Sequence, residues 1–171
     1  ELLQEALEAA DEVLWPEPHP ELQRLEPLIG RWKQSGRTKD SILGHGVPYT
    51  SEEHFYWLEG GHFLVQTYDS TFGTEPAQKG INFWYFDQDT NRFEIIFFSN
   101  NGPFTEEGNR YHGAIEEGRL TFTGPAQFTH QLDQEGRISV TENGSIESRW
   151  SLRDENGEFQ PWMDARLHPA D

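Results

Sequence analysis

The chain has 171 residues, of which 34% are hydrophobic and 13% aromatic. This length favours a single domain, and the aromatic content excludes a disordered chain. The 30 acidic residues outnumber the 13 basic ones and give a net charge of −17. Such a charge repels phosphate groups and argues against nucleic acids or membrane surfaces as partners. Because the sequence has no cysteine, disulfides and thiolate metal ligands are excluded. No secretory signal pattern is visible, and we expect a cytoplasmic protein.

The first part of the chain differs in pattern from the rest. Apolar residues recur at steps of three and four over residues 2–14, which predicts one amphipathic helix. Three prolines follow over residues 15–20, and they end the helix because proline lacks the backbone N–H and favours extended conformations. We therefore divide the chain into a helix with a proline-rich linker, residues 1–20, and one barrel domain, residues 21–171.

The barrel domain opens on a second short helical turn, expected over residues 21–28, where Leu22, Leu25 and Leu28 fall on one side. From Gly30 onward the hydrophobic period changes to two, and clusters of Gly, Asn, Asp and Pro separate the apolar runs. About ten short strands joined by tight turns predict an all-β, antiparallel up-and-down barrel, because closure removes exposed strand edges. The strand-like runs cover residues 30–38, 49–58, 62–72, 80–87, 92–99, 109–116, 118–123, 126–133, 137–142, 145–153 and 159–168, with 124–125 and 133–136 among the expected turns.

Alternation within the strands indicates which residues face inward. Ile146, Trp150 and Leu152 share one face of their strand, opposite charged and polar residues, and are expected inside. The strands at residues 80–87 and 92–99 are apolar on both faces. Their outer faces therefore predict cover by the N-terminal helix or a subunit contact, so the protein is expected to be a monomer or a homodimer.

The size and composition of the barrel favour binding of a small molecule. About eight to ten strands enclose an interior that side chains fill or that holds one small ligand. Our first hypothesis is that a small apolar molecule is bound by inward aromatic side chains, with a few polar groups to orient it. Ordinary core packing is the alternative for many of these aromatics. The residues assigned to the ligand are Trp57, Phe83, Phe97, Phe128, Trp150 and Trp162, with His112 and His130 as polar partners.

The second hypothesis is a cofactor-free enzyme of the cyclase or isomerase type. His54 and Tyr56 share one face of their strand, and His130 shares an inward-looking face with Phe128 and Leu132. Imidazole exchanges protons near neutral pH, so these are candidate acid–base groups, with ordinary surface or core histidines as the alternative. The histidine spacing matches no metal-site motif, and we expect no metal.

Several motifs occur in a characteristic order along the chain. They are Gly30-Arg31-Trp32 in a strand that reaches Gly36, Trp57-Leu58-Glu59-Gly60-Gly61-His62-Phe63, Tyr85-Phe86-Asp87, and Gln160-Pro161-Trp162-Met163-Asp164. Over residues 20–168 this set resembles a bacterial family of small lipocalin-like (calycin) barrels of unassigned function. That family is distantly similar to the haem-binding nitrobindins and to fatty-acid-binding proteins. The resemblance implies the barrel fold and makes haem a third alternative, whereas the residues themselves point to no cofactor.

The position of the haem ligand separates this chain from the nitrobindins. In that family the iron-ligating histidine lies on the last strand, at a position that matches Trp162. An indole N–H is a donor only and cannot ligate iron. Another strand would therefore have to supply the ligand, and the candidates are His54, His62, His112 and His130.

The orientation of the last strand remains open at this point. Alternation places Met163, Ala165 and Leu167 inside and leaves Asp164 and Arg166 in solvent. The resemblance implies the opposite, because the position of the haem ligand faces the cavity. Asp164 would then be a further acid–base candidate and Arg166 a ligand-binding cation, each requiring a polar partner inside the barrel.

Overall fold

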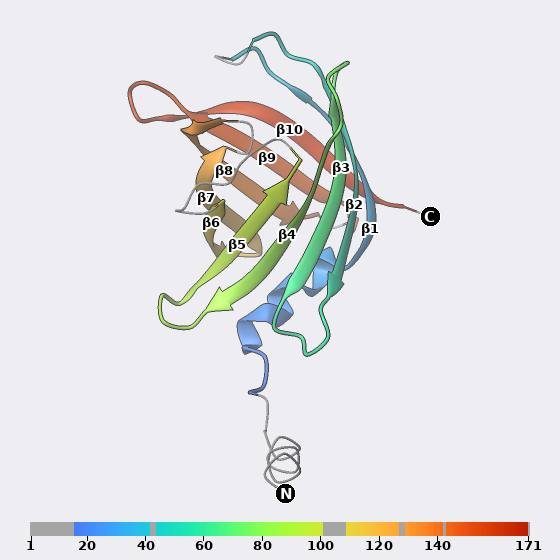
Figure 1. Ribbon diagram of the computed structural model, residues 1–171, viewed down its shortest axis with the longest axis vertical. Coiled ribbons are helices and arrows are strands. Elements are labelled where there is room, and N and C mark those ends of the chain that lie inside the picture. Colours follow the sequence, from blue (N-terminus) through green and yellow to red (C-terminus); the bar gives the residue numbers. More distant parts are fainter. Residues whose placement is uncertain (1–15, 42–43, 101–108, 127–128, 142, 171) are drawn as a thin grey trace, which may run out of the picture.

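A closed barrel with one short helix at its end forms the described part of the chain (Figure 1). The computed structural model describes residues 16–41, 44–100, 109–126, 129–141 and 143–170. For residues 129–131 it describes the backbone path only. The amphipathic helix expected at the N-terminus and Phe128 lie outside the described residues.

Each strand pairs antiparallel with its neighbour in the chain, and the first strand pairs with the last to close the barrel. The expected all-β, up-and-down barrel of ten strands is thus confirmed. Closure leaves no free strand edge, which is the physical advantage of a barrel over an open sheet. The elements are η1 (Pro20–Leu28), β1 (Gly30–Thr38), β2 (Pro48–Trp57), β3 (Leu64–Phe72), β4 (Gln78–Asp87), β5 (Arg92–Ser99), β6 (Arg110–Glu116), β7 (Arg119–Ala126), β8 (Thr129–Val140), β9 (Ile146–Arg153) and β10 (Phe159–Pro169).

Two expected turns are instead parts of strands. Gly124-Pro125 lies within β7, and residues 133–136 lie within the long strand β8. A Cβ atom on Gly136 would stand 2.4 Å from Cζ of Phe122 and 3.0 Å from Cζ3 of Trp150. The glycine is therefore explained by the close packing of two aromatic rings inside the barrel and not by a turn.

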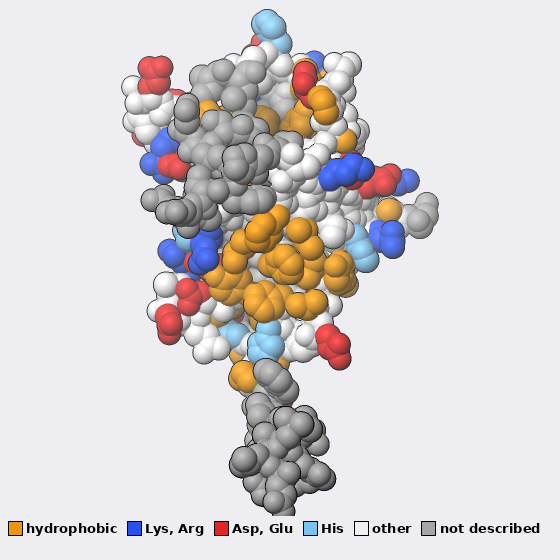
Figure 2. Space-filling model, in the orientation of Figure 1, with side chains coloured by type: hydrophobic (Ala, Val, Ile, Leu, Met, Phe, Trp, Pro, Cys, Tyr) orange, Lys and Arg blue, Asp and Glu red, His pale blue; other side chains and the backbone are white. Residues whose placement is uncertain are grey.

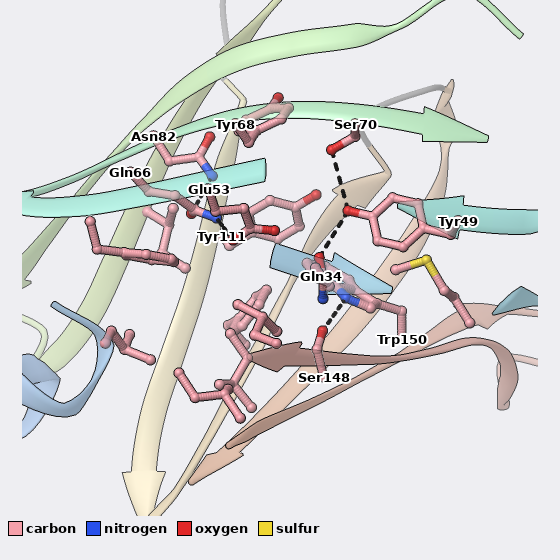
Figure 3. A pocket seen from close by; sticks show the side chains of 18 of the residues that line it. Gln34, Tyr49, Glu53, Gln66, Tyr68, Ser70, Asn82, Tyr111, Ser148 and Trp150 are labelled. Carbon is pink, nitrogen blue, oxygen red and sulfur yellow. Dashed lines mark hydrogen bonds between the residues drawn. The ribbon is translucent and has the colours of Figure 1, made fainter. Parts of the chain in front are cut away.

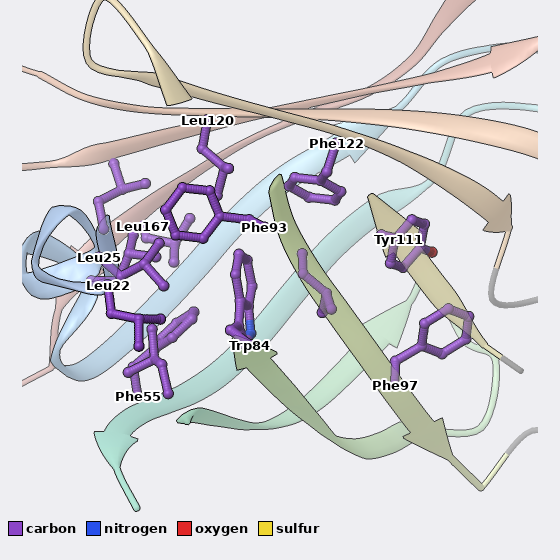
Figure 4. Close-up of a cluster of buried hydrophobic side chains, with 14 of the residues drawn as sticks. Leu22, Leu25, Phe55, Trp84, Phe93, Phe97, Tyr111, Leu120, Phe122 and Leu167 are labelled. Carbon is purple, nitrogen blue, oxygen red and sulfur yellow. The ribbon is translucent and has the colours of Figure 1, made fainter. Parts of the chain in front are cut away.

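The helix η1 covers one end of the barrel (Figure 4). It is a 3-10 helix, in which side chains three residues apart lie above one another, so Leu22, Leu25 and Leu28 form one buried row, as expected. The Nε1 of Trp32 on β1 donates to the carbonyl oxygen of Leu28 at 2.7 Å and fixes the helix to the barrel. No helix in the described ranges is long and apolar enough to cross a membrane.

An aromatic patch lies on the outer face of strands β3 to β5 and forms the large hydrophobic area in Figure 2. Phe63 contacts Phe83 and Tyr85, and Phe83 contacts Phe98. Phe63 and Phe98 are 36% and 41% exposed. These outer faces are apolar as the sequence indicated, and the described residues leave part of the patch in solvent.

Candidate functional site

The barrel contains a partly open cavity of about 100 Å³ (Figure 3). It lies between the apolar cluster at η1 and a second apolar cluster built around Trp162 and Met163. Strands β1 to β4 supply most of its polar wall, whereas β5 to β10 contribute mainly apolar side chains. The polar lining residues from β1 to β4 are Gln34, Tyr49, Glu53, Gln66, Tyr68, Ser70, Gln78 and Asn82.

A carboxyl and two amides form the first polar group of this wall. Gln66 Nε2 donates to Glu53 Oε2 at 2.9 Å. Asn82 Nδ2 donates to Gln66 Oε1 at 2.8 Å, and Trp84 Nε1 donates to the same oxygen at 3.1 Å. The four residues come from three consecutive strands and lie side by side, because strand pairing sets Gln66 opposite both Phe55 and Asn82.

A chain of hydroxyl groups forms the second polar group. The Tyr49 hydroxyl donates to Gln34 Oε1 at 3.0 Å and lies 3.3 Å from Ser70 Oγ. Ser70 Oγ in turn donates to Ser51 Oγ at 2.9 Å. Figure 3 shows this chain beside the Glu53 group, with Ser148 and Trp150 on the opposite strand. Such buried groups are stable only when they are hydrogen-bonded, which these contacts achieve in part.

Burial controls the titration of the polar wall. Glu53 is 8% exposed, and the loss of solvent raises its pKa to about 7, although hydrogen bonds from Gln66 and Ser51 oppose the shift. Burial likewise raises the pKa of Tyr68 to about 12 and that of Tyr49 still further. Glu53 has no ion-pair partner among the described residues, so it is the lining group that changes charge near neutral pH.

Two amide oxygens of residues that line the cavity lack hydrogen-bond donors among the described residues. They are Asn82 Oδ1 and Gln134 Oε1, on side chains that are 6% and 3% exposed. The Nε2 atom of Gln134 donates to the Tyr111 hydroxyl at 2.5 Å. A buried carbonyl without a donor costs about 1–3 kcal/mol. A water molecule or a ligand in the cavity would remove this cost.

Some of the residues assigned to a ligand lie at the cavity and others do not. Trp150 and Trp162 line it. Phe97 is buried inside the barrel and stacks on Tyr111, with ring centroids 4.9 Å apart, but it does not line the cavity. Trp57 packs against the cluster at η1, and its Nε1 donates to Glu26 Oε1 at 2.8 Å.

Other predicted site residues lie on the outer face of the barrel. Phe83 belongs to the aromatic patch described above. His54 and Tyr56 alternate with the inward Glu53 and Phe55, and their rings contact each other outside at 5.0 Å. His112 Nδ1 lies 2.7 Å from Glu94 Oε2, also on the outside. His130 lies on β8, where its side chain is not described.

A β-bulge decides the orientation of the last strand. The register between β10 and β9 shifts between Pro161 and Met163, which turns both Trp162 and Met163 inward. Trp162, at the position that the resemblance implies to be internal, therefore does line the cavity. Alternation resumes after the bulge, so Asp164 and Arg166 lie outside, as alternation predicted and against the expectation drawn from the resemblance. Asp164 pairs with Lys39 at 2.6 Å, and Arg166 pairs with Glu147 at 2.6 Å.

Glu53, Gln66 and Asn82 were not among the residues that the sequence pointed to. A glutamate or an amide in an alternating strand ordinarily faces solvent. The signal that identifies Glu53 is its position in the run Tyr49, Ser51, Glu53 and Phe55, in which every second residue is buried. Because Tyr49 and Phe55 face inward, the alternation of the strand places Glu53 inward as well.

A closed, ten-stranded antiparallel barrel with a short helix at one end and an internal cavity defines a protein of the calycin type. Within this class, the chain belongs to the family of THAP4-like, heme-binding beta-barrel domains, which matches residues 21–168. The resemblance to the nitrobindins is thereby confirmed.

Two solved structures share the fold. Rv2717c from M. tuberculosis is 19% identical, with a TM-score of 0.59 over 90% of this chain and 99% of that chain. The S-type phycobiliprotein lyase CPES from Guillardia theta is 9% identical, with a TM-score of 0.61 over 87% of this chain and 92% of that chain. At these identities the likeness establishes the fold alone. No curated protein sequence matches the chain.

The cavity does not fit the haem that the family description names. Its volume of about 100 Å³ is well below the roughly 300–1,000 Å³ of pockets for drug-sized ligands, and a haem is at least as large as such ligands. None of the histidine side chains in the described part lines it. The described residues also contain no group of three or more His, Cys, Asp or Glu that could hold a metal ion.

Proposed function

We propose that this protein binds a small molecule with an apolar ring inside its barrel. The observation that carries the proposal is a partly open cavity inside the barrel, in which aromatic walls meet polar groups whose hydrogen-bonding capacity is incompletely used. Ligand sites in proteins have this composition, a mainly apolar lining with a few convergent polar groups.

The volume of the cavity leaves room for no more than one small ring inside the barrel. A cavity of about 150 Å³ lined by apolar side chains accepts benzene, and this cavity holds about 100 Å³. Three rings supply flat apolar surfaces at the cavity: Phe122 contacts both Trp84 and Trp150. The family description is no obstacle to a smaller ligand, because one barrel fold hosts different ligands.

The experiment compares two neighbouring isoleucines on β5. Ile95 lines the cavity, whereas Ile96 faces outward. We expect that at least one of furan, benzene, 1-methylimidazole and 2-aminoimidazole binds in saturation-transfer NMR. Ile95→Phe fills the cavity and should weaken binding about ten-fold or more, which corresponds to about 1.4 kcal/mol. Ile96→Phe adds the same atoms outside and should leave binding unchanged. Equal binding by both variants, or no binding by any probe, would contradict the proposal.

A further inference from the structure

One part of the polar wall, the group of Glu53, Gln66 and Asn82, has more acceptors than donors. In the group of Glu53, Gln66 and Asn82, each amide nitrogen donates to the next side chain. The oxygen of Asn82 is left without a donor, and the carboxyl of Glu53 is an acceptor in its ionised form. Across the barrel, Gln134 Oε1 is a second amide oxygen without a donor.

The orientation of these amides follows from one donor. An indole nitrogen can only donate, so the Gln66 atom that faces Trp84 Nε1 at 3.1 Å must be the oxygen. The nitrogen of Gln66 therefore faces Glu53. The Asn82 atom that lies 2.8 Å from the Gln66 oxygen must then be the nitrogen. The remaining polar atom of Asn82, Oδ1, is consequently an acceptor. Exchanging the nitrogen and oxygen of either amide would set donor against donor or acceptor against acceptor.

We propose that the ligand of this cavity is a flat molecule, no larger than one ring, that presents N–H donors of the amidine, guanidine or amino-heterocycle class to Asn82 Oδ1 and Glu53. This inference rests on the proposed function and names its ligand class. A donor-only group complements the oxygens of Asn82 and of ionised Glu53, whereas a carbonyl or carboxylate placed against these two residues would leave both sides without donors.

The surroundings of the acceptors favour the same class. Trp84 lies beside Gln66 and contacts Phe122, with ring centroids 5.9 Å apart. Aromatic faces of this kind bind flat cations as well as neutral rings. The net charge of −17 attracts cations to the protein as a whole and repels anions. A cationic amino-heterocycle would also meet the ionised form of Glu53 without a competing cation among the described residues.

The test compares probes of matched ring size on the full chain. Dissociation constants are measured by NMR titration in buffer alkaline enough to keep 1-methylimidazole neutral. The probes are 2-aminoimidazole, which has several N–H donors, and furan and neutral 1-methylimidazole, which have none. We expect 2-aminoimidazole to bind about ten-fold more tightly than either, the effect of one or two added hydrogen bonds. Asn82→Leu should remove most of this preference and leave the affinity for furan unchanged.

A matched variant distinguishes the loss of a ligand contact at Asn82 from the general effect of replacing a buried asparagine. Asn109 is 3% exposed and also has an oxygen without a donor, but it does not line the cavity. Asn109→Leu should therefore keep the preference for 2-aminoimidazole. If Asn82→Leu does not fold, Glu53→Gln supplies the test, because it replaces an acceptor oxygen with a donor and should reduce the same preference.

Each outcome decides between the two proposals. Tighter binding of 2-aminoimidazole that is lost in Asn82→Leu or Glu53→Gln supports the inference. A second outcome is that furan and 2-aminoimidazole bind with equal affinity and that Ile95→Phe weakens the binding of both. The cavity would then bind rings, but water and not the ligand would donate to Asn82, and the inference on ligand class would be overturned. If no probe binds the wild-type protein, the proposed function itself fails.

Discussion

At the scale of single residues, Glu53 is the group that most clearly departs from ordinary behaviour. A carboxyl that is buried without a cation resists ionisation, and its pKa rises from 4.5 to about 7. The folded state therefore holds this proton more tightly than the unfolded state. The contribution of Glu53 to stability is complete below about pH 4.5 and is lost as the pH rises through about 7.

Glu53→Gln tests this linkage. The variant keeps an amide oxygen for Gln66 to donate to and has no charge to bury. The quantity compared is the free energy of unfolding of the variant minus that of wild type. This difference should be about 3 kcal/mol more positive at about pH 8 than at about pH 4.5. Urea unfolding of both proteins at the two pH values measures this change.

The neighbour Glu52 provides the control. It is exposed on the outer face of β2, and Glu52→Gln should shift stability by a similar small amount at both pH values. A Glu53→Gln variant that differs from wild type equally at both pH values would show that Glu53 ionises freely in the folded protein.

At the scale of elements, η1 determines how one end of the barrel is closed. Leu25 is 1% exposed and lies with Leu22 and Leu28 over the barrel end. Leu25→Ala should destabilise the protein by about 2–5 kcal/mol, because it opens a cavity under a short helix that depends on packing. Chemical unfolding measures the loss.

Gln23 lies on the exposed side of the same helix. Gln23→Ala should change the free energy of unfolding by less than about 0.5 kcal/mol. If both alanine variants have wild-type stability, η1 contributes little to the closure of the barrel.

The strands show which features a sequence pattern can predict. Alternation correctly placed Ile146 and Leu152 inside, and the three-residue spacing correctly placed Leu22, Leu25 and Leu28 on one side of η1. It could not predict the bulge in β10, because a bulge is a property of pairing with β9 and leaves no mark in the period of one strand.

The candidate site was less accessible to prediction than the fold. The apolar half of the cavity follows from aromatic residues such as Trp150, which composition and alternation indicate. The polar half depends on Glu53, Gln66 and Asn82, which are ordinary surface residue types and become a site only when strands β2 to β4 are paired. The position of His54 outside the barrel follows from the same register.

At the scale of the whole molecule, the cavity sets the chain apart from the ligand that its family description names. Addition of haemin should give no Soret spectrum of a specifically ligated haem, because the cavity is small and no described histidine side chain lines it. A sharp Soret band at one equivalent of haemin, lost in Met163→Ala, would show instead that the barrel opens and that a lining residue ligates iron.

The most direct test of the central claim, that the barrel interior is the binding site, is a methyl NMR titration of the isoleucine-labelled protein with 2-aminoimidazole. Ile95 and Ile146 line the cavity, and Ile96 lies on the outer face. The account predicts saturable shifts of the Ile95 and Ile146 methyl signals and an unchanged Ile96 signal. Shifts confined to Ile96, or no saturable shift at any of the three, would contradict it.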